Sequence, residues 1–102
     1  MIQKKRIAVL GSTGSIGTQA LEVVRSHREA FEVTVLVARR STELLIAQAL
    51  EFSPAVVVIS DEAYYPEVRQ ALSHTSIEVM AGSEAIAEAV VRPDVDIVLT
   101  AM

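Results

Sequence analysis

Hydrophobic residues form two patterns along this chain: short unbroken runs, and stretches in which they recur every three or four positions. An unbroken run predicts a strand that is buried on both faces, as in a parallel sheet, whereas the wider spacing predicts an amphipathic helix. The runs predict strands over residues 6–10, 33–38, 55–60, 77–81 and 95–102. The spaced stretches predict helices over 15–26, from the N-cap Ser41 to Phe52, from Pro66 to Ser73, and over 84–91.

The alternation of strands and helices predicts one α/β domain with a doubly wound parallel sheet. Helices on both faces of about five strands give three layers, and the right-handed crossover rule predicts the strand order 4-3-2-1-5. Residues 95–102 then form an apolar edge strand, so we expect the chain to self-associate as a two-fold or swapped homodimer through this strand or the uncovered sheet face beside it. The alternative is a soluble monomer whose C-terminal strand frays. Because the strand reaches Met102, we also expect the chain to be a piece of a longer protein.

The turn after the first predicted strand is rich in glycine. Gly11, Gly14 and Gly17 follow one another at three-residue spacing, between the apolar run and the first helix. This is the context of a dinucleotide-binding loop, in which the glycines serve a tight turn, the approach of a pyrophosphate and close helix packing. Ser12, Thr13 and Ser15 add hydroxyl donors. The pattern predicts a Rossmann-like cofactor site, with a structural turn that binds no ligand as the alternative.

The residues after the second predicted strand bear on the choice between NAD and NADP. An acidic residue at this place accepts hydrogen bonds from the ribose 2′-hydroxyl and selects NAD. This chain has Arg39 and Arg40 there, followed by Ser41. Guanidinium groups bind phosphate in bidentate fashion, so the pair favours NADP. The alternative is that both arginines are merely solvated.

The charge of the chain is unevenly distributed. Residues 1–40 carry seven basic and three acidic side chains, whereas residues 41–102 carry two basic and ten acidic ones, for a net charge of −4. The positive half contains the glycine loop and suits an anionic cofactor, while the net charge argues against a nucleic-acid partner. The chain has no cysteine, which excludes thiol chemistry. Without a signal sequence or membrane-spanning run, we expect a cytoplasmic protein with no membrane partner.

The sequence offers no catalytic residue and no metal ligand. It lacks a His, Asp and Glu cluster with metal-binding spacing, and both histidines fall at predicted helix ends. The tyrosine–x–x–x–lysine pair of short-chain dehydrogenases is missing, because Val68 and Arg69 follow Tyr64 and Tyr65 at that distance. Three functions remain open: the cofactor domain of a reductase, a non-enzymatic NADP(H)-binding module, or part of another NADP-dependent oxidoreductase.

Several segments closely resemble the start of the 1-deoxy-D-xylulose 5-phosphate reductoisomerase family. They are residues 5–17, 21–25, 31–33, 36–38, Gln48, 51–54, 78–82 and 94–102, and they extend over nearly the whole chain. The string Gly-Ser-Thr-Gly-Ser-Ile-Gly at 11–17 is quite specific to that family. The resemblance implies that residues 1–102 are an N-terminal NADPH-binding domain, truncated at its C-terminal end. The family's enzyme makes 2-C-methyl-D-erythritol 4-phosphate for non-mevalonate isoprenoid biosynthesis.

The resemblance also implies roles for particular residues. Thr13, Gly14, Ser15 and Ile16 would hold the pyrophosphate of NADPH. Residues 39–41, Arg-Arg-Ser, replace the family's usual Gly-Lys-Asn, and Arg40 keeps the positive charge expected for the 2′-phosphate. Arg39 and Ser41 depart from the pattern at the adenosine end. The catalytic and C-terminal domains, which bind the Mg²⁺ or Mn²⁺ ion and the sugar-phosphate substrate, would lie outside this chain.

Overall fold

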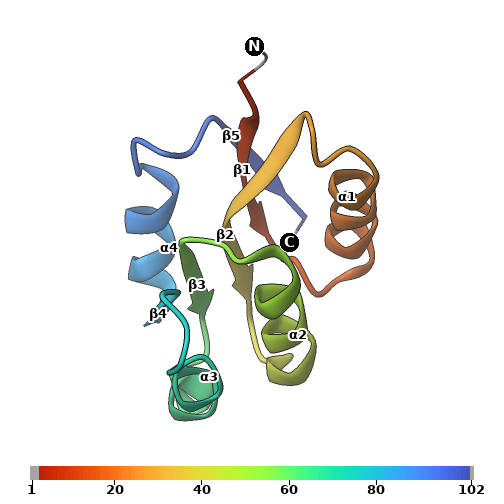
Figure 1. Ribbon diagram of the computed structural model, residues 1–102. Coiled ribbons are helices and arrows are strands. Elements are labelled where there is room, and N and C mark those ends of the chain that lie inside the picture. The colour runs from red at the N-terminus through yellow and green to blue at the C-terminus, as the bar shows by residue number, and fades with distance from the viewer. Residues whose placement is uncertain (1–2, 102) are drawn as a thin grey trace.

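The computed structural model describes residues 3–101 and contains alternating strands and helices (Figure 1). The strands are β1 (Lys5–Leu10), β2 (Phe31–Ala38), β3 (Val56–Ile59), β4 (Glu78–Ala81) and β5 (Ile97–Thr100). The helices are α1 (Ser15–Ser26), α2 (Thr42–Phe52), α3 (Tyr65–Ala71) and α4 (Ser83–Val90), and a 3₁₀ turn, η1 (Glu62–Tyr64), precedes α3. Every predicted element is present, with boundaries that differ by one or two residues at most ends. Met102, the predicted end of the fifth strand, lies outside the described residues.

The five strands form one parallel sheet in the order β4-β3-β2-β1-β5. This confirms the predicted doubly wound α/β fold and its strand order. β4 and β5 are the edges, and both are short, at four residues each. On β5, Ile97 and Val98 remain 38% and 46% exposed. The expected dimer through this strand stays a prediction.

Helices cover both faces of the sheet and give the three layers. Figure 1 shows α4 on one side of the strands and α1 and α2 on the other. The buried side chains divide accordingly, because Leu21, Leu45 and Leu72 pack with one set of strand residues beneath α1, α2 and α3. Ala85 and Ala89 of α4 pack with the opposite set. The continuous apolar runs of the central strands therefore supply two separate cores, one on each face.

A bulge interrupts the pairing of β1 with β2. Ile7 pairs with Val33 and Ala8 with Val35, so Thr34 is an extra residue on β2. Thr34 is buried, and the insertion moves the following side chains to the opposite face. Val33 accordingly belongs to the core under α1–α3, and Val35 to the core under α4. The sequence did not predict this bulge, because an unbroken apolar run has no alternation to reveal a shift.

Two glycines let α1 begin directly beside the end of β1. Gly11 has φ of 86°, a conformation that side-chain-bearing residues rarely adopt. A Cβ atom on Gly17 would lie 2.1 Å from the Gly11 carbonyl oxygen and 2.7 Å from Cα of Ser12. The backbone of the first helical turn therefore rests on the backbone of the loop, as the glycine spacing predicts.

Arg6 and Asp96 fasten the edge strand β5 to β1. The Asp96 N–H donates to the Arg6 carbonyl oxygen at 2.8 Å. In return, the Asp96 carboxylate accepts the Arg6 backbone N–H at 2.8 Å and two guanidinium hydrogen bonds at 3.0 and 3.1 Å. The side-chain hydrogen bond from Arg6 is the main reason that the pKa of Asp96 falls from 3.8 to about 2. The pairing of β5 is thus anchored just before its first residue.

We expect Gly17→Ala to lower the free energy of unfolding by about 1–3 kcal/mol, the usual cost of overpacking. The added Cβ meets rigid backbone of Gly11 and Ser12, and not a side chain that can move aside. Helix propensity alone would favour alanine by about 1 kcal/mol. Urea unfolding of the variant, compared with Gly14→Ala, measures the difference. At Gly14 the new Cβ would lie 3.7 Å from the nearest atom, so we expect Gly14→Ala to lose less stability. A Gly17→Ala variant as stable as the wild type would contradict the packing argument.

We expect the stabilising effect of the Asp96 carboxylate to be present above pH 3.8 and to disappear as the pH falls toward about 2. The folded-state pKa is lowered, so protonation on acidification favours the unfolded state. Urea unfolding of the wild type and of Asp96→Asn across this range isolates the contribution. The stability difference between the two proteins should be constant above pH 3.8 and shrink toward pH 2. A difference that does not change with pH would show that the ion pair contributes nothing.

Candidate functional site

The glycine loop, which continues from β1, is hydrogen-bonded to the end of β2. The N–H groups of Gly11 and Ser12 both donate to the carbonyl oxygen of Val37, at 2.8 and 2.9 Å. The loop then closes on itself, because the Gly14 N–H donates to the Gly11 carbonyl oxygen at 3.2 Å. Its shape is therefore set by backbone hydrogen bonds to a central strand.

The loop presents the first turn of α1 to solvent. Gly14 is the N-cap, with φ of −80° and ψ of 176°, and Thr18 is the first residue of the helix to donate back, to the Gly14 carbonyl oxygen at 2.8 Å. The helix N–H groups that precede Thr18 have no acceptor within the helix. The helix dipole also makes this end of α1 favourable for an anion. Gly14, Ser15 and Ile16 are exposed, and the Ile16 side chain is 62% exposed. A phosphate can therefore approach this backbone closely.

Ser12 does not belong to this exposed surface. It is fully buried, so the expectation that its hydroxyl serves as a donor beside Thr13 and Ser15 is wrong for this conformation. Its carbonyl oxygen instead accepts a hydrogen bond from Gln48 Nε2 of α2, at 2.9 Å. Gln48 is buried too, and it ties α2 to the loop. The sequence analysis named Gln48 only as part of the family resemblance and assigned it no structural role, although an amide on the apolar stripe of α2, between Leu45 and Phe52, was a visible signal.

Arg39, Arg40 and Ser41 follow β2 directly and are all exposed. Ser41 takes the predicted N-cap position of α2, but its side chain makes no capping hydrogen bond. Arg40 Nε lies 3.1 Å from Oδ2 of Asp61, which comes two residues after β3. The sequence analysis did not predict that Asp61 lies at this site. The predicted strand order already placed the end of β3, and hence the residues that follow it, beside the end of β2.

The predicted site residues come from two segments at one edge of the sheet. β1 and β2 are neighbours and end level with each other, because Leu10 pairs with Val37. Thr13–Ile16 therefore follow β1, and Arg39–Ser41 follow β2, at the same carboxyl edge. Ligands of doubly wound sheets bind at this edge. The arrangement can hold an anionic nucleotide between helix-start N–H groups and a pair of guanidinium groups.

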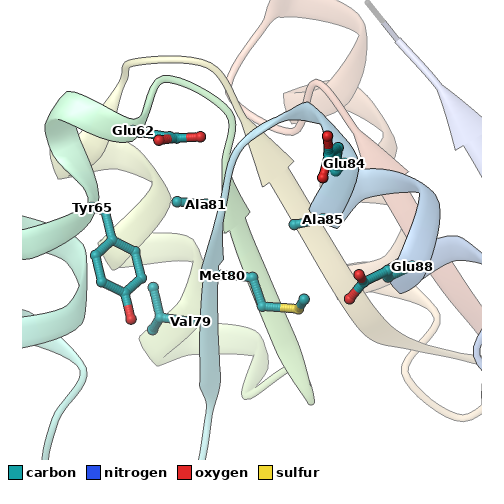
Figure 2. Close-up of a pocket in the computed structure, with 8 residues that line it drawn as sticks. All are labelled: Glu62, Tyr65, Val79, Met80, Ala81, Glu84, Ala85 and Glu88. Atoms are coloured by element: carbon teal, nitrogen blue, oxygen red, sulfur yellow. The ribbon is translucent and has the colours of Figure 1, made fainter.

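A cavity of about 520 Å³ lies elsewhere, beside the edge strand β4 (Figure 2). Figure 2 shows Tyr65 and Val79 on one side of β4 and Met80 and Ala85 on the other. The remaining lining residues are Ala81 and three glutamates, Glu62, Glu84 and Glu88. Three carboxylates with no basic residue among the lining side chains repel phosphate groups. The cavity is therefore not suited to a dinucleotide.

Neither a metal-ligand cluster nor a membrane-spanning helix occurs in the part of the chain that the structure describes. No group of three His, Asp or Glu side chains in residues 3–101 converges as metal ligands do. Over the same residues, none of the helices has the length and hydrophobicity needed to cross a bilayer.

Known proteins share both the sequence and this architecture. Residues 7–102 match the family model for 1-deoxy-D-xylulose 5-phosphate reductoisomerase. The reductoisomerases of Bacteroides fragilis and Bacteroides thetaiotaomicron are 50% and 52% identical to the chain, over 99% and 98% of its length. The chain spans only 26% of each of these relatives.

Solved structures give the same result. The Zymomonas mobilis reductoisomerase in complex with NADPH is 33% identical and superimposes with a TM-score of 0.82, over 85% of this chain and 23% of that one. A DOX-P reductoisomerase in complex with NADPH, fosmidomycin and magnesium is 28% identical, with a TM-score of 0.90 over 96% of this chain and 24% of that one. From its sequence and its fold, the chain belongs to the 1-deoxy-D-xylulose 5-phosphate reductoisomerase family.

Proposed function

We propose that residues 1–102 are the NADPH-binding domain of a reductoisomerase that converts 1-deoxy-D-xylulose 5-phosphate to 2-C-methyl-D-erythritol 4-phosphate. The observation that carries the proposal is the position of the glycine loop and Arg39–Arg40 at one edge of the sheet, after the adjacent strands β1 and β2. Family membership supports the same conclusion, since two of the structurally similar reductoisomerases are complexes with NADPH.

The pyrophosphate of NADPH lies on the start of α1 in this proposal. Backbone N–H groups of the segment Thr13–Ile16 donate to its oxygens, and the hydroxyls of Thr13 and Ser15 add side-chain donors. The open backbone at Gly14 leaves room for the phosphate. Ile16, which is exposed beside the loop, packs against the apolar edge of the dinucleotide. The favourable helix dipole adds to these contacts without any movement of the loop.

The adenosine end lies after β2. Arg40 binds the 2′-phosphate with its guanidinium group, while Arg39 and Ser41 border the adenine and ribose. A guanidinium group matches the geometry of phosphate and remains charged at any physiological pH. This contact gives NADPH its advantage over NADH, because NADH carries a hydroxyl at the same position.

The chemistry of the complete enzyme extends beyond these residues. NADPH supplies the hydride for the reduction, and this chain binds and orients the cofactor. The metal seen in similar reductoisomerases has no ligand cluster among residues 3–101, so we assign the metal, the substrate phosphate and the catalytic residues to other parts of the enzyme. We also propose that the enzyme is cytoplasmic, that it acts in isoprenoid biosynthesis, and that it forms a homodimer with contacts through β5.

We expect Arg40→Ala to weaken NADPH binding by about 1–3 kcal/mol, the range for loss of a charged hydrogen bond. NADH binding should change little, because NADH lacks the 2′-phosphate. Calorimetric titration with both cofactors measures the effect. Arg69→Ala is the matched control, since Arg69 lies on α3 and bonds Tyr65. Equal losses for NADPH and NADH would contradict the role assigned to Arg40.

We expect Gly14→Val to abolish dinucleotide binding while the protein remains folded. The protein itself leaves space at this position, because a Cβ atom on Gly14 would lie 3.7 Å from its nearest neighbour, so the branched side chain obstructs the ligand and not the fold. Circular dichroism and cofactor titration of the same sample separate the two effects. A folded variant that still binds NADPH would mean that the loop does not face the pyrophosphate.

A further inference from the structure

Asp61 is held beside the proposed adenosine site by the pairing of β3 with β2. The N–H of Ser60 donates to the carbonyl oxygen of Ala38 at 2.9 Å. The N–H of Asp61 donates to the carbonyl oxygen of Arg39 at 3.1 Å. Backbone hydrogen bonds between the two segments thus continue for two residues beyond the end of β3 and one residue beyond the end of β2. This continuation places an acidic residue directly alongside the two arginines.

The Asp61 carboxylate has two partners, one on each oxygen. Oδ1 accepts the backbone N–H of Ala63 at 3.1 Å and caps the turn η1. Oδ2 accepts a hydrogen bond from Arg40 Nε at 3.1 Å. The side chain of Asp61 is 31% exposed and that of Arg40 is 60% exposed. The carboxylate is therefore fixed in orientation, whereas the guanidinium group extends into solvent and can change partners.

We propose that Asp61 is a specificity-determining residue that competes with the 2′-phosphate of NADPH for Arg40 and thereby weakens the preference for NADPH over NADH. This inference rests on the proposed function, since it requires that the dinucleotide binds at this edge of the sheet. The sequence segment directly after β2, residues 39–42, contains no acidic residue, so the acid that acts at this position comes from the neighbouring strand.

The competition follows from charge. When the phosphate binds Arg40, it either displaces Asp61 or leaves two anions to share one cation, and both cases reduce affinity. An exposed ion pair is weak, so the reduction amounts to about two- to fivefold in the dissociation constant. NADH presents a ribose hydroxyl instead, which can donate to the carboxylate, as it does to the acidic residue of NAD-selective sites. Asp61 therefore disfavours NADPH and either favours NADH or leaves it unaffected.

The main alternative is that Asp61 strengthens NADPH binding. Asp61 could hold Arg40 in the orientation that the phosphate needs, and its removal would then weaken NADPH binding. The two accounts predict opposite signs for the same substitution.

Asp61→Asn tests the proposal. The amide removes the charge and retains an oxygen that can cap η1 through the Ala63 N–H. Glu62→Gln is the matched control, because it removes the charge of the adjacent residue, which is exposed and is not the carboxylate that pairs with Arg40. Each variant and the wild type are titrated with NADPH and NADH, and their folding is checked by circular dichroism. Should Asp61→Asn fail to fold, Asp61→Ser retains a capping oxygen and serves in its place.

We expect Asp61→Asn to bind NADPH about two- to fivefold more tightly, to bind NADH equally or more weakly, and to lose this gain when Arg40→Ala is also present. Glu62→Gln should leave the ratio of the two affinities unchanged. Weaker NADPH binding by Asp61→Asn, or an equal shift for both cofactors, overturns the inference alone, provided that the wild type binds NADPH. A wild-type chain that does not bind NADPH overturns the proposed function and this inference together.

Discussion

The site depends on one contact, the close approach of the first turn of α1 to the end of β1. Gly17 makes it possible, since any side chain there would collide with the Gly11 carbonyl oxygen. The approach fixes where α1 starts and hence where its unpaired N–H groups point. The same helix buries Leu21 and Val24 against the sheet, so the core beneath α1 and the exposed start of α1 depend on the same geometric requirement.

The neighbouring elements reinforce this arrangement from two directions. The carbonyl oxygen of Val37, at the end of β2, accepts hydrogen bonds from two N–H groups of the loop. The side chain of Gln48, on α2, donates to the carbonyl oxygen of Ser12 in the same loop. The segment after β2 then carries Arg39 and Arg40 to the same edge. The residues to which we assign phosphate recognition therefore come from segments that are already connected, which favours a preformed site.

The sequence predicted the fold well because its signals are local or topological. Apolar runs mark the strands, and the crossover rule orders them, so the arrangement β4-β3-β2-β1-β5 follows from the sequence pattern alone. The missed features are contacts between distant segments or irregularities without a pattern. The bulge at Thr34, the burial of Ser12 and the Arg40–Asp61 pair each depend on register or side-chain direction, which hydrophobic spacing does not encode.

The double hydrogen bond to Val37 has a consequence for how the molecule opens. Loops usually fluctuate independently of the sheet that they follow. Here the amides of Gly11 and Ser12 are bound to a central strand, so they become free only when the β1–β2 pair separates. We therefore expect the start of the glycine loop to open together with the β1–β2 pair, and later than the short edge strands β4 and β5. Fraying at the sheet edges therefore leaves the start of the glycine loop in place.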